Sequence, residues 1–210
     1  MTILALEFSS ERRSVALARE GAVLAEAVEQ SGGRGTSAFA LIEKVLLESK
    51  VLRGQVEVIA AGLGPGSYTG IRAAIAIAQG WQLATGVKLL GVSSAEAIAA
   101  QAQADKTLGR VNVVIDAQRG EFYLATWEIS RDGREEVAPL KIVSAAELLS
   151  RQSAGELCLG PEMTPKIFPR AVMVARLAAG RTNFLTGESL EPIYLRETSF
   201  VKAPPPRLTI

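Results

Sequence analysis

Two acidic residues lie at the ends of predicted strands, where they could hold a metal ion. Glu7 ends the apolar run from Ile3, and Asp116 ends the run from Val111. A turn and a second strand-like run follow each of them. Carboxylates at the ends of two equivalent strands could face each other across a cleft and hold a hydrated Mg²⁺. Isolated acidic residues at strand ends are also common and are usually just exposed to solvent. The residues alone therefore leave both interpretations open, a metal site and solvent-exposed acids.

A glycine-rich turn at residues 62–70 is the second candidate for chemistry. Its backbone amides, followed by a predicted helix, could hold a phosphate or another anion. Ile71 and Arg72 stand where a P-loop needs Lys followed by Ser or Thr, and the glycine spacing does not fit the dinucleotide fingerprint. The alternative is a tight turn before a helix capped by Ser67 or Thr69.

The composition excludes several classes of catalytic site and partner. The 210 residues contain no histidine, which excludes Ser-His-Asp and Cys-His nucleophiles and HExxH zinc sites. A formal charge of +1 is too balanced for the whole molecule to attract nucleic acid or membranes, so such contacts would be local or made through another protein. The sequence contains one cysteine, Cys158, and its N-terminus has no basic region, which together predict a cytoplasmic protein. No apolar run reaches about 18 residues, so no membrane span is expected.

The pattern of apolar residues predicts the elements that carry these groups. Strands at 3–8, 14–19 and 22–29 form a meander, and a helix follows with apolar residues at 38, 41, 42, 45 and 46. A strand at 56–61, a helix at about 71–84, a strand at 87–92 and a helix ending near 104 complete this half. The alternation predicts parallel later strands covered by helices.

The second half of the sequence repeats the order of a strand, a turn and a second strand that opens the first half. Strands at 111–116 and 121–129 form a hairpin, and a strand near 137–143, a helix near 145–152, a strand at 157–160 and a helix near 171–179 follow. This weak internal duplication predicts two α/β lobes, at 1–106 and 107–210. The second is reduced and ends in an extended, proline-rich tail at 203–207.

Two early helices are apolar over more than one face. Phe39 and Leu47 fall outside the main apolar stripe of the first helix. The helix after the glycine-rich turn interleaves small residues with Ile71, Ile75 and Ile77. Both helices could simply cover the sheet of their own chain, or they could present an apolar patch to a second subunit.

Five sequence motifs resemble the bacterial TsaB (YeaZ) family, shortened relatives of TsaD in the actin-like ATPase superfamily. The motifs span nearly the whole chain and lie at residues 3–17, 64–72, 91–94, 115–123 and 192–196. The resemblance implies a two-lobed actin-like ATPase fold of the ribonuclease H-like α/β type, with duplicated mixed sheets and a reduced second lobe.

The resemblance also implies a function without catalysis in this chain. Such a subunit would bind TsaD, with TsaE, in the threonylcarbamoylation of the adenosine next to the anticodon of tRNAs that read codons beginning with A. Cofactors are expected to be absent from this chain, because ATP and metal would reside on the partner subunits. The chain alone is expected to be a homodimer, and tRNA would be reached only through the complex.

In the family the two early helices form the contact with TsaD or with a second copy. The residues that the resemblance places there are Thr36, Phe39, Ile42, Leu46, Tyr68, Thr69, Ile71, Arg72, Ile75 and Gln79. A vestigial nucleotide cleft would fall at Glu7, Ser9 and Asp116, and no metal ligands are expected.

Two departures from the family pattern bear on these sites. Glu7-Phe8-Ser9 replaces the usual Asp-Thr-Ser, which weakens the case for nucleotide binding. Gly35-Thr36-Ser37 replaces a region that often contains His-Ser, so the contribution of that imidazole is either absent or replaced by hydroxyl capping.

Two enzymatic alternatives remain. The first is a stand-alone Mg-ATP-dependent enzyme of the actin/sugar-kinase type, which would use Glu7, Asp116 and the turn at 62–70. The second is a metal-dependent glycoprotease, for which the sequence offers no ligand cluster.

Overall fold

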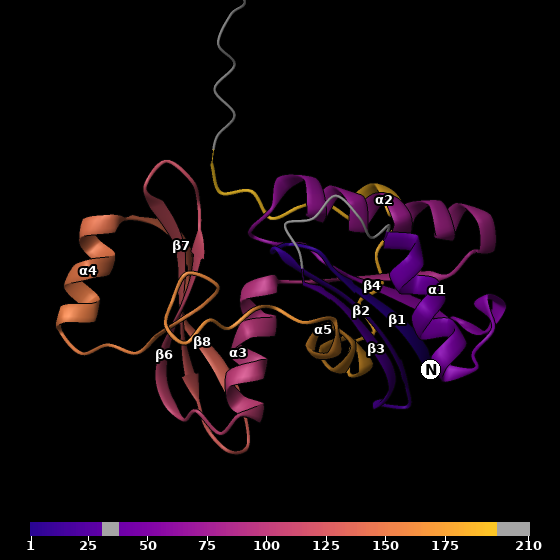
Figure 1. Cartoon of the computed structure of the whole chain (residues 1–210), viewed down its shortest axis with the longest axis horizontal. Coiled ribbons are helices and arrows are strands. Elements are labelled where there is room, and N and C mark those ends of the chain that lie inside the picture. The colour runs from indigo at the N-terminus through magenta and orange to yellow at the C-terminus, as the bar shows by residue number, and fades with distance from the viewer. Residues whose placement is uncertain (31–37, 197–210) are drawn as a thin grey trace, which may run out of the picture.

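The computed structural model describes residues 1–30 and 38–196, which form two mixed β-sheets and five α-helices within these ranges (Figure 1). In chain order the elements are β1 (Thr2–Glu7), β2 (Arg12–Arg19), β3 (Ala22–Gln30), α1 (Ala38–Ser49), η1 (Arg53–Gln55), β4 (Val58–Gly62), α2 (Tyr68–Thr85), β5 (Lys88–Val92), α3 (Ser94–Ala104), β6 (Gly109–Asp116), β7 (Glu121–Ile129), β8 (Arg134–Ser144), α4 (Ala145–Ser153), β9 (Cys158–Leu159), α5 (Ala171–Ala179) and η2 (Gly187–Ser189).

The first sheet has the strand order β3-β2-β1-β4-β5. The meander β1-β2-β3 is antiparallel, and β1, β4 and β5 are parallel, as the sequence predicts. Alternate side chains point to opposite faces of these strands. Leu4, Leu6 and Ile59 pack towards α1 and α2, whereas Ile3 and Val58 pack towards α5. Both faces are therefore covered at β1 and β4, which explains why these two strands are almost entirely apolar.

The second sheet has the order β8-β7-β6-β9, with β9 parallel to β6 and the other pairs antiparallel. Its two faces are covered by different helices. Trp127 and Ile129 belong to the cluster that packs against α3, and Leu148 of α4 packs against the opposite face with Leu124. Figure 1 shows α3 between the two sheets and α4 on the outer side of the second sheet.

One helix crosses back between the halves of the chain. α5 lies in the predicted second lobe by sequence, yet its buried face packs on β1 and β2 of the first sheet. Ser14 Oγ accepts a hydrogen bond of 2.9 Å from the amide of Ala171 at the start of this helix, and Arg170 pairs with Glu26 of β3. The predicted division at residue 106 stays a prediction.

Two sequence predictions concern a membrane span and the tail at 203–207. Within the described ranges, no helix is long and apolar enough to cross a membrane. The predicted extended tail at 203–207 lies outside the described residues.

Candidate functional site

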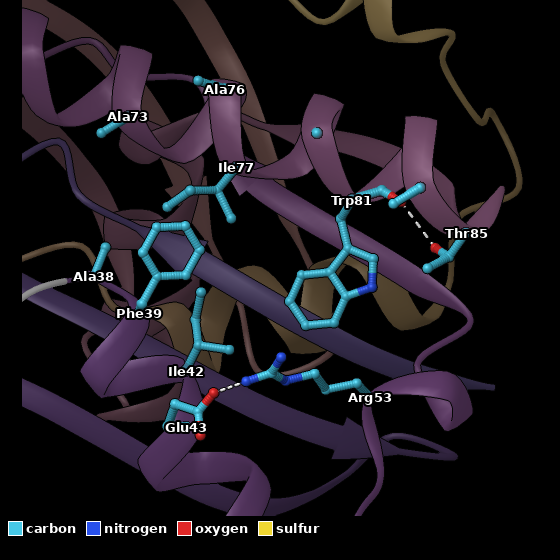
Figure 2. A pocket seen from close by; sticks show the side chains of 12 residues that line it. Ala38, Phe39, Ile42, Glu43, Arg53, Ala73, Ala76, Ile77, Trp81 and Thr85 are labelled. Carbon is cyan, nitrogen blue, oxygen red and sulfur yellow. Dashed lines mark hydrogen bonds and ion pairs between the residues drawn. The ribbon is translucent and has the colours of Figure 1, made fainter.

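An apolar groove of about 720 Å³ lies between α1 and α2 on the outer side of the first sheet (Figure 2). Figure 2 shows Phe39 and Ile42 of α1 facing Ile77 and Trp81 of α2 across the groove. An ion pair between Glu43 and Arg53 lies beside it. The lining residues are Ala38, Phe39, Ile42, Glu43, Arg53, Ala73, Ala76, Ile77, Gly80, Trp81, Ala84 and Thr85.

The groove exists because α2 has two apolar faces. Ile71, Ala74, Ile75 and Ala78 form the buried face that packs on the sheet. Alanine and glycine dominate the outer face, which carries the partly buried Ile77 and Trp81 as its large apolar side chains. Small residues leave room between two helices, so the groove stays open.

Local signals fix the two ends of α2. Ser67 is the N-cap, and its Oγ accepts a hydrogen bond of 3.3 Å from the amide of Gly70. Gly86 ends the helix in the left-handed conformation, with φ of 74°. The turn at 62–70 thus matches the capped-turn interpretation of the sequence.

Two glycines of this turn are required by close backbone contact. A Cβ atom at Gly70 would lie 1.9 Å from the carbonyl oxygen of Phe8, and one at Gly66 would lie 2.1 Å from that of Ser9. Ser67 also donates its amide to the Ser9 carbonyl at 2.6 Å. The glycine-rich turn therefore packs against the end of β1.

The residues predicted at the partner contact separate into two groups. Ile42, Leu46, Ile71 and Ile75 are buried in the core of their own chain, where they hold α1 and α2 on the sheet. Phe39, Tyr68, Thr69 and Arg72 are exposed, and Gln79 is partly exposed. Thr36 lies outside the described residues. Phe39 and Ile42 also line the groove.

Gln79 and Arg72 contact the C-terminal segment. The side-chain amide of Gln79 donates to the carbonyl of Gly187 at 2.7 Å. The Arg72 guanidinium lies 4.3 Å from the centre of the Tyr68 ring and donates from Nε to the Tyr194 hydroxyl at 3.2 Å. The rings of Tyr68 and Tyr194 are stacked with their centres 5.7 Å apart.

The sequence reasoning missed Trp81 and did not place Ile77 at the groove. A signal was present, because Ala73, Ile77, Gly80, Trp81 and Ala84 recur at helical spacing on the side opposite the buried face. The small residues of this helix lie on both of its faces, so their presence alone does not distinguish the groove from the core.

A second cleft of about 740 Å³ lies where the two sheets meet, and it contains two of the three predicted nucleotide-cleft residues. Ser9 and Asp116 line it, together with Ser67, Glu162 and other residues. Both carboxylate oxygens of Asp116 accept hydrogen bonds from Gln118, at 2.8 Å from its amide and 2.6 Å from its side chain. Partial burial raises the pKa of Glu162, and the nearby charge of Asp116 adds to this rise.

Glu7 does not line this cleft. Its side chain is fully buried, accepts hydrogen bonds from the amide of Ser9 at 2.8 Å and from the hydroxyl of Ser94 at 2.9 Å, and fills the space left by Gly62. Burial raises the pKa of the Glu7 carboxyl, while the hydrogen bonds from Ser9 and Ser94 act in the opposite direction.

The two strand-end carboxylates therefore do not face each other across this cleft. Glu7 is withdrawn into the core, and Asp116 is committed to Gln118. In residues 1–30 and 38–196, no three acidic, Cys or His side chains come together in a way that could hold a metal ion.

Comparison with known proteins identifies the family. Residues 36–191 match the family model described as TsaD, tRNA N6-adenosine threonylcarbamoyltransferase. The Escherichia coli (strain K12) protein called tRNA threonylcarbamoyladenosine biosynthesis protein TsaB is 33% identical over 133 residues, and the Bacillus subtilis (strain 168) protein of the same name is 29% identical over 164 residues. The chain belongs to the TsaB (YeaZ) family.

The matches differ in how much of each relative they cover. The aligned region spans 63% of this chain and 58% of the E. coli protein, against 76% and 71% for the B. subtilis protein. The solved structure of YeaZ from Pseudomonas aeruginosa superimposes with a TM-score of 0.79 at 24% identity and covers 92% of this chain and 99% of that one. The two mixed sheets and this match confirm the predicted α/β class with two mixed sheets, which is the fold of YeaZ.

Proposed function

We propose that this TsaB-family chain is a noncatalytic subunit in the biosynthesis of threonylcarbamoyladenosine in tRNA, and that it binds TsaD through the groove between α1 and α2. The names of its relatives and of the matching family model support the pathway. The observation that carries the binding site is the open groove itself, in which aromatic and aliphatic side chains are left partly uncovered. Contiguous exposed apolar surface of this kind is typical of protein interfaces.

The chemistry of the groove suits an apolar helix of a partner protein. Ala73, Ala76 and Gly80 allow close approach of another helix, and Phe39 and Trp81 supply the large aromatic contacts that often dominate binding energy. Phe39 is 63% exposed in the chain alone. Burying such surface against TsaD would favour association, and a second copy of the chain would use the same groove when TsaD is absent.

The catalytic step would belong to TsaD. The chain contains no histidine and buries Glu7, and the proposal gives no catalytic role to Asp116 and Glu162, the carboxyl groups that line its cleft. Under the proposal, the chain carries no cofactor, TsaE and TsaD supply the ATP and metal chemistry, and the assembly acts on tRNA in the cytoplasm.

A matched pair of substitutions tests the binding site. Phe39→Glu places a charge in the groove, whereas Leu149→Glu places one on α4, at a leucine of nearly equal exposure (62%). A charge left unpaired in a desolvated contact opposes binding strongly, so we expect Phe39→Glu to weaken TsaD binding at least about 100-fold and Leu149→Glu to leave it unchanged. Calorimetric titration of TsaD with each variant measures this difference.

Equal binding by both variants would contradict the assigned groove. A reconstitution tests the role: TsaD, TsaE, the enzyme that makes threonylcarbamoyl-adenylate and tRNA should give repeated modification only when this chain is added. Titration of the chain alone with Mg-ATP tests the kinase-type alternative, which requires a binding heat that we expect to be absent.

A further inference from the structure

A pocket of about 460 Å³ lies where α3, α5 and the β7–β8 turn meet. This location is separate from the α1–α2 groove and from the cleft between the sheets. Arginine, glutamine and apolar side chains surround it, and no carboxylate is among them. The lining residues are Ala100, Gln103, Ala104, Arg131, Arg134, Met173, Arg176, Leu177 and Gly180.

The fold gathers three arginines that are scattered in the sequence. Arg131 lies in the turn between β7 and β8, Arg134 begins β8, and Arg176 comes from the last turn of α5. α3 and α5 pack against each other, which brings Arg176 to the same pocket as the turn. The proximity of these three cations is a product of tertiary structure.

One arginine of the pocket is held by hydrogen bonds to a neighbouring side chain, and the other two are exposed. Arg134 donates to the Gln103 side chain at 3.0 Å and lies 3.6 Å from Glu96, while Gln103 itself donates to the carbonyl of Ser130 at 3.1 Å. Arg131 and Arg176 are exposed, and neither forms an ion pair with any residue in 1–30 or 38–196.

Glu96 offsets part of the charge of Arg134, whereas Arg131 and Arg176 have no acidic partner among residues 1–30 and 38–196. Glu96 accepts two hydrogen bonds of 2.6 Å from Arg181, so its charge is shared between Arg181 and Arg134. Asp132 and Glu136 lie on the same hairpin as Arg131 but do not line the pocket. Near the end of α3, the carbonyls of Gln101, Gln103 and Ala102 accept the amides of Asp105, Lys106 and Thr107.

We infer that this pocket binds a phosphate group of an RNA strand. Guanidinium groups bind phosphate oxygens through paired hydrogen bonds, and two exposed arginines at one concave site, with Arg134 beside them, suit a phosphate better than an uncharged ligand. The apolar walls from Met173 and Leu177 suit the sugar edge of a nucleotide. The choice of RNA over a free phosphate compound rests on the proposed function, in which the assembly acts on tRNA.

The test uses the full chain assembled with TsaD and TsaE, and a fluorescently labelled, unmodified tRNA transcript as probe. The double variant Arg131→Gln/Arg176→Gln removes the two exposed arginines. The control Arg119→Gln/Lys141→Gln removes the same charge from the β6–β7 turn and from β8, where both residues are exposed. We expect the first variant to bind tRNA about tenfold more weakly, with a salt slope reduced by about 1 to 2, and the control to change affinity less than about twofold.

Inorganic phosphate, titrated against the chain alone at constant ionic strength, distinguishes the two sources of phosphate. If it binds through Arg131 and Arg176 while tRNA affinity is unaffected by the double variant, the RNA assignment is overturned. If neither probe responds to the substitutions, the site is overturned altogether. Co-elution of each variant with TsaD tests the groove proposal separately. The double variant should assemble with TsaD as the wild type does, whether or not the groove is the contact.

Discussion

At the scale of single residues, Glu7 shows how burial changes the chemistry of a strand-end carboxylate. The sequence correctly marks it as a charged residue at the end of β1, but the direction of its side chain depends on contacts distant in sequence. Gly62 lacks the Cβ that would lie 2.1 Å from the carboxylate, and Ser94 provides a hydroxyl. Spacing along the chain could not reveal either contact.

The buried carboxyl of Glu7 should make stability depend on pH. Its folded pKa is raised above the ordinary value of 4.5, chiefly by burial, so the folded state holds this proton more tightly than the unfolded state. The stabilisation is complete below pH 4.5 and is lost as the pH rises through the folded pKa, at up to about 1.4 kcal/mol per pH unit.

Glu7→Gln mimics the neutral carboxyl and removes this titration. We expect the variant to gain stability relative to wild type as the pH rises above 4.5, and to show no such gain below it. Urea unfolding of both proteins from pH 4 to pH 8 measures the difference, in which the contributions of other carboxyls cancel. Parallel stability curves would show that Glu7 ionises in the folded state as easily as in the unfolded state.

At the scale of elements, the apolar periodicity predicted nearly every helix and strand because each one buries a regular face. The predicted hairpin strand at 121–129 and helix at 171–179 match the structure to the residue. β8 begins at Arg134 rather than near 137, because its first residues are polar and pair along a sheet edge without being buried. The packing of α5 on the first sheet had no local signal, since its buried residues fit any apolar surface equally well.

A buried residue of α2 and an exposed residue of α1 predict losses of stability of different size for similar substitutions. Ile75 is 6% exposed and belongs to the core under the helix, so Ile75→Glu buries a charge and should destabilise the chain by about 3 kcal/mol or more. Phe39→Glu, on the exposed side of α1, should cost less than about 1 kcal/mol. Chemical denaturation compares the two directly, and a large loss for Phe39→Glu would mean that the groove is part of the core.

At the scale of the whole molecule, the segment at 185–196 connects both sheets and α2. The amide of Leu185 donates to Leu89 of β5 at 2.9 Å, and that of Ile193 donates to Leu63 at 2.9 Å. Tyr194 then stacks on Tyr68 at the start of α2. Arg196 completes the connection at the β6–β7 turn of the second sheet, where it donates to the carbonyl of Ala117 at 2.9 Å and to Glu121 at 2.6 Å.

Arg196 joins this segment to the second sheet through two hydrogen bonds, so its loss should weaken that connection without unfolding either sheet. Arg196→Ala removes two hydrogen bonds and should cost about 1 to 2 kcal/mol, with faster amide exchange at Ile193 and around the β6–β7 turn but unchanged exchange in β1 and β4. Arg110→Ala is the control, because Arg110 is 68% exposed and forms a surface ion pair with Glu128 at 3.7 Å. Equal hydrogen exchange in the two variants would mean that the segment contacts the second sheet without stabilising it.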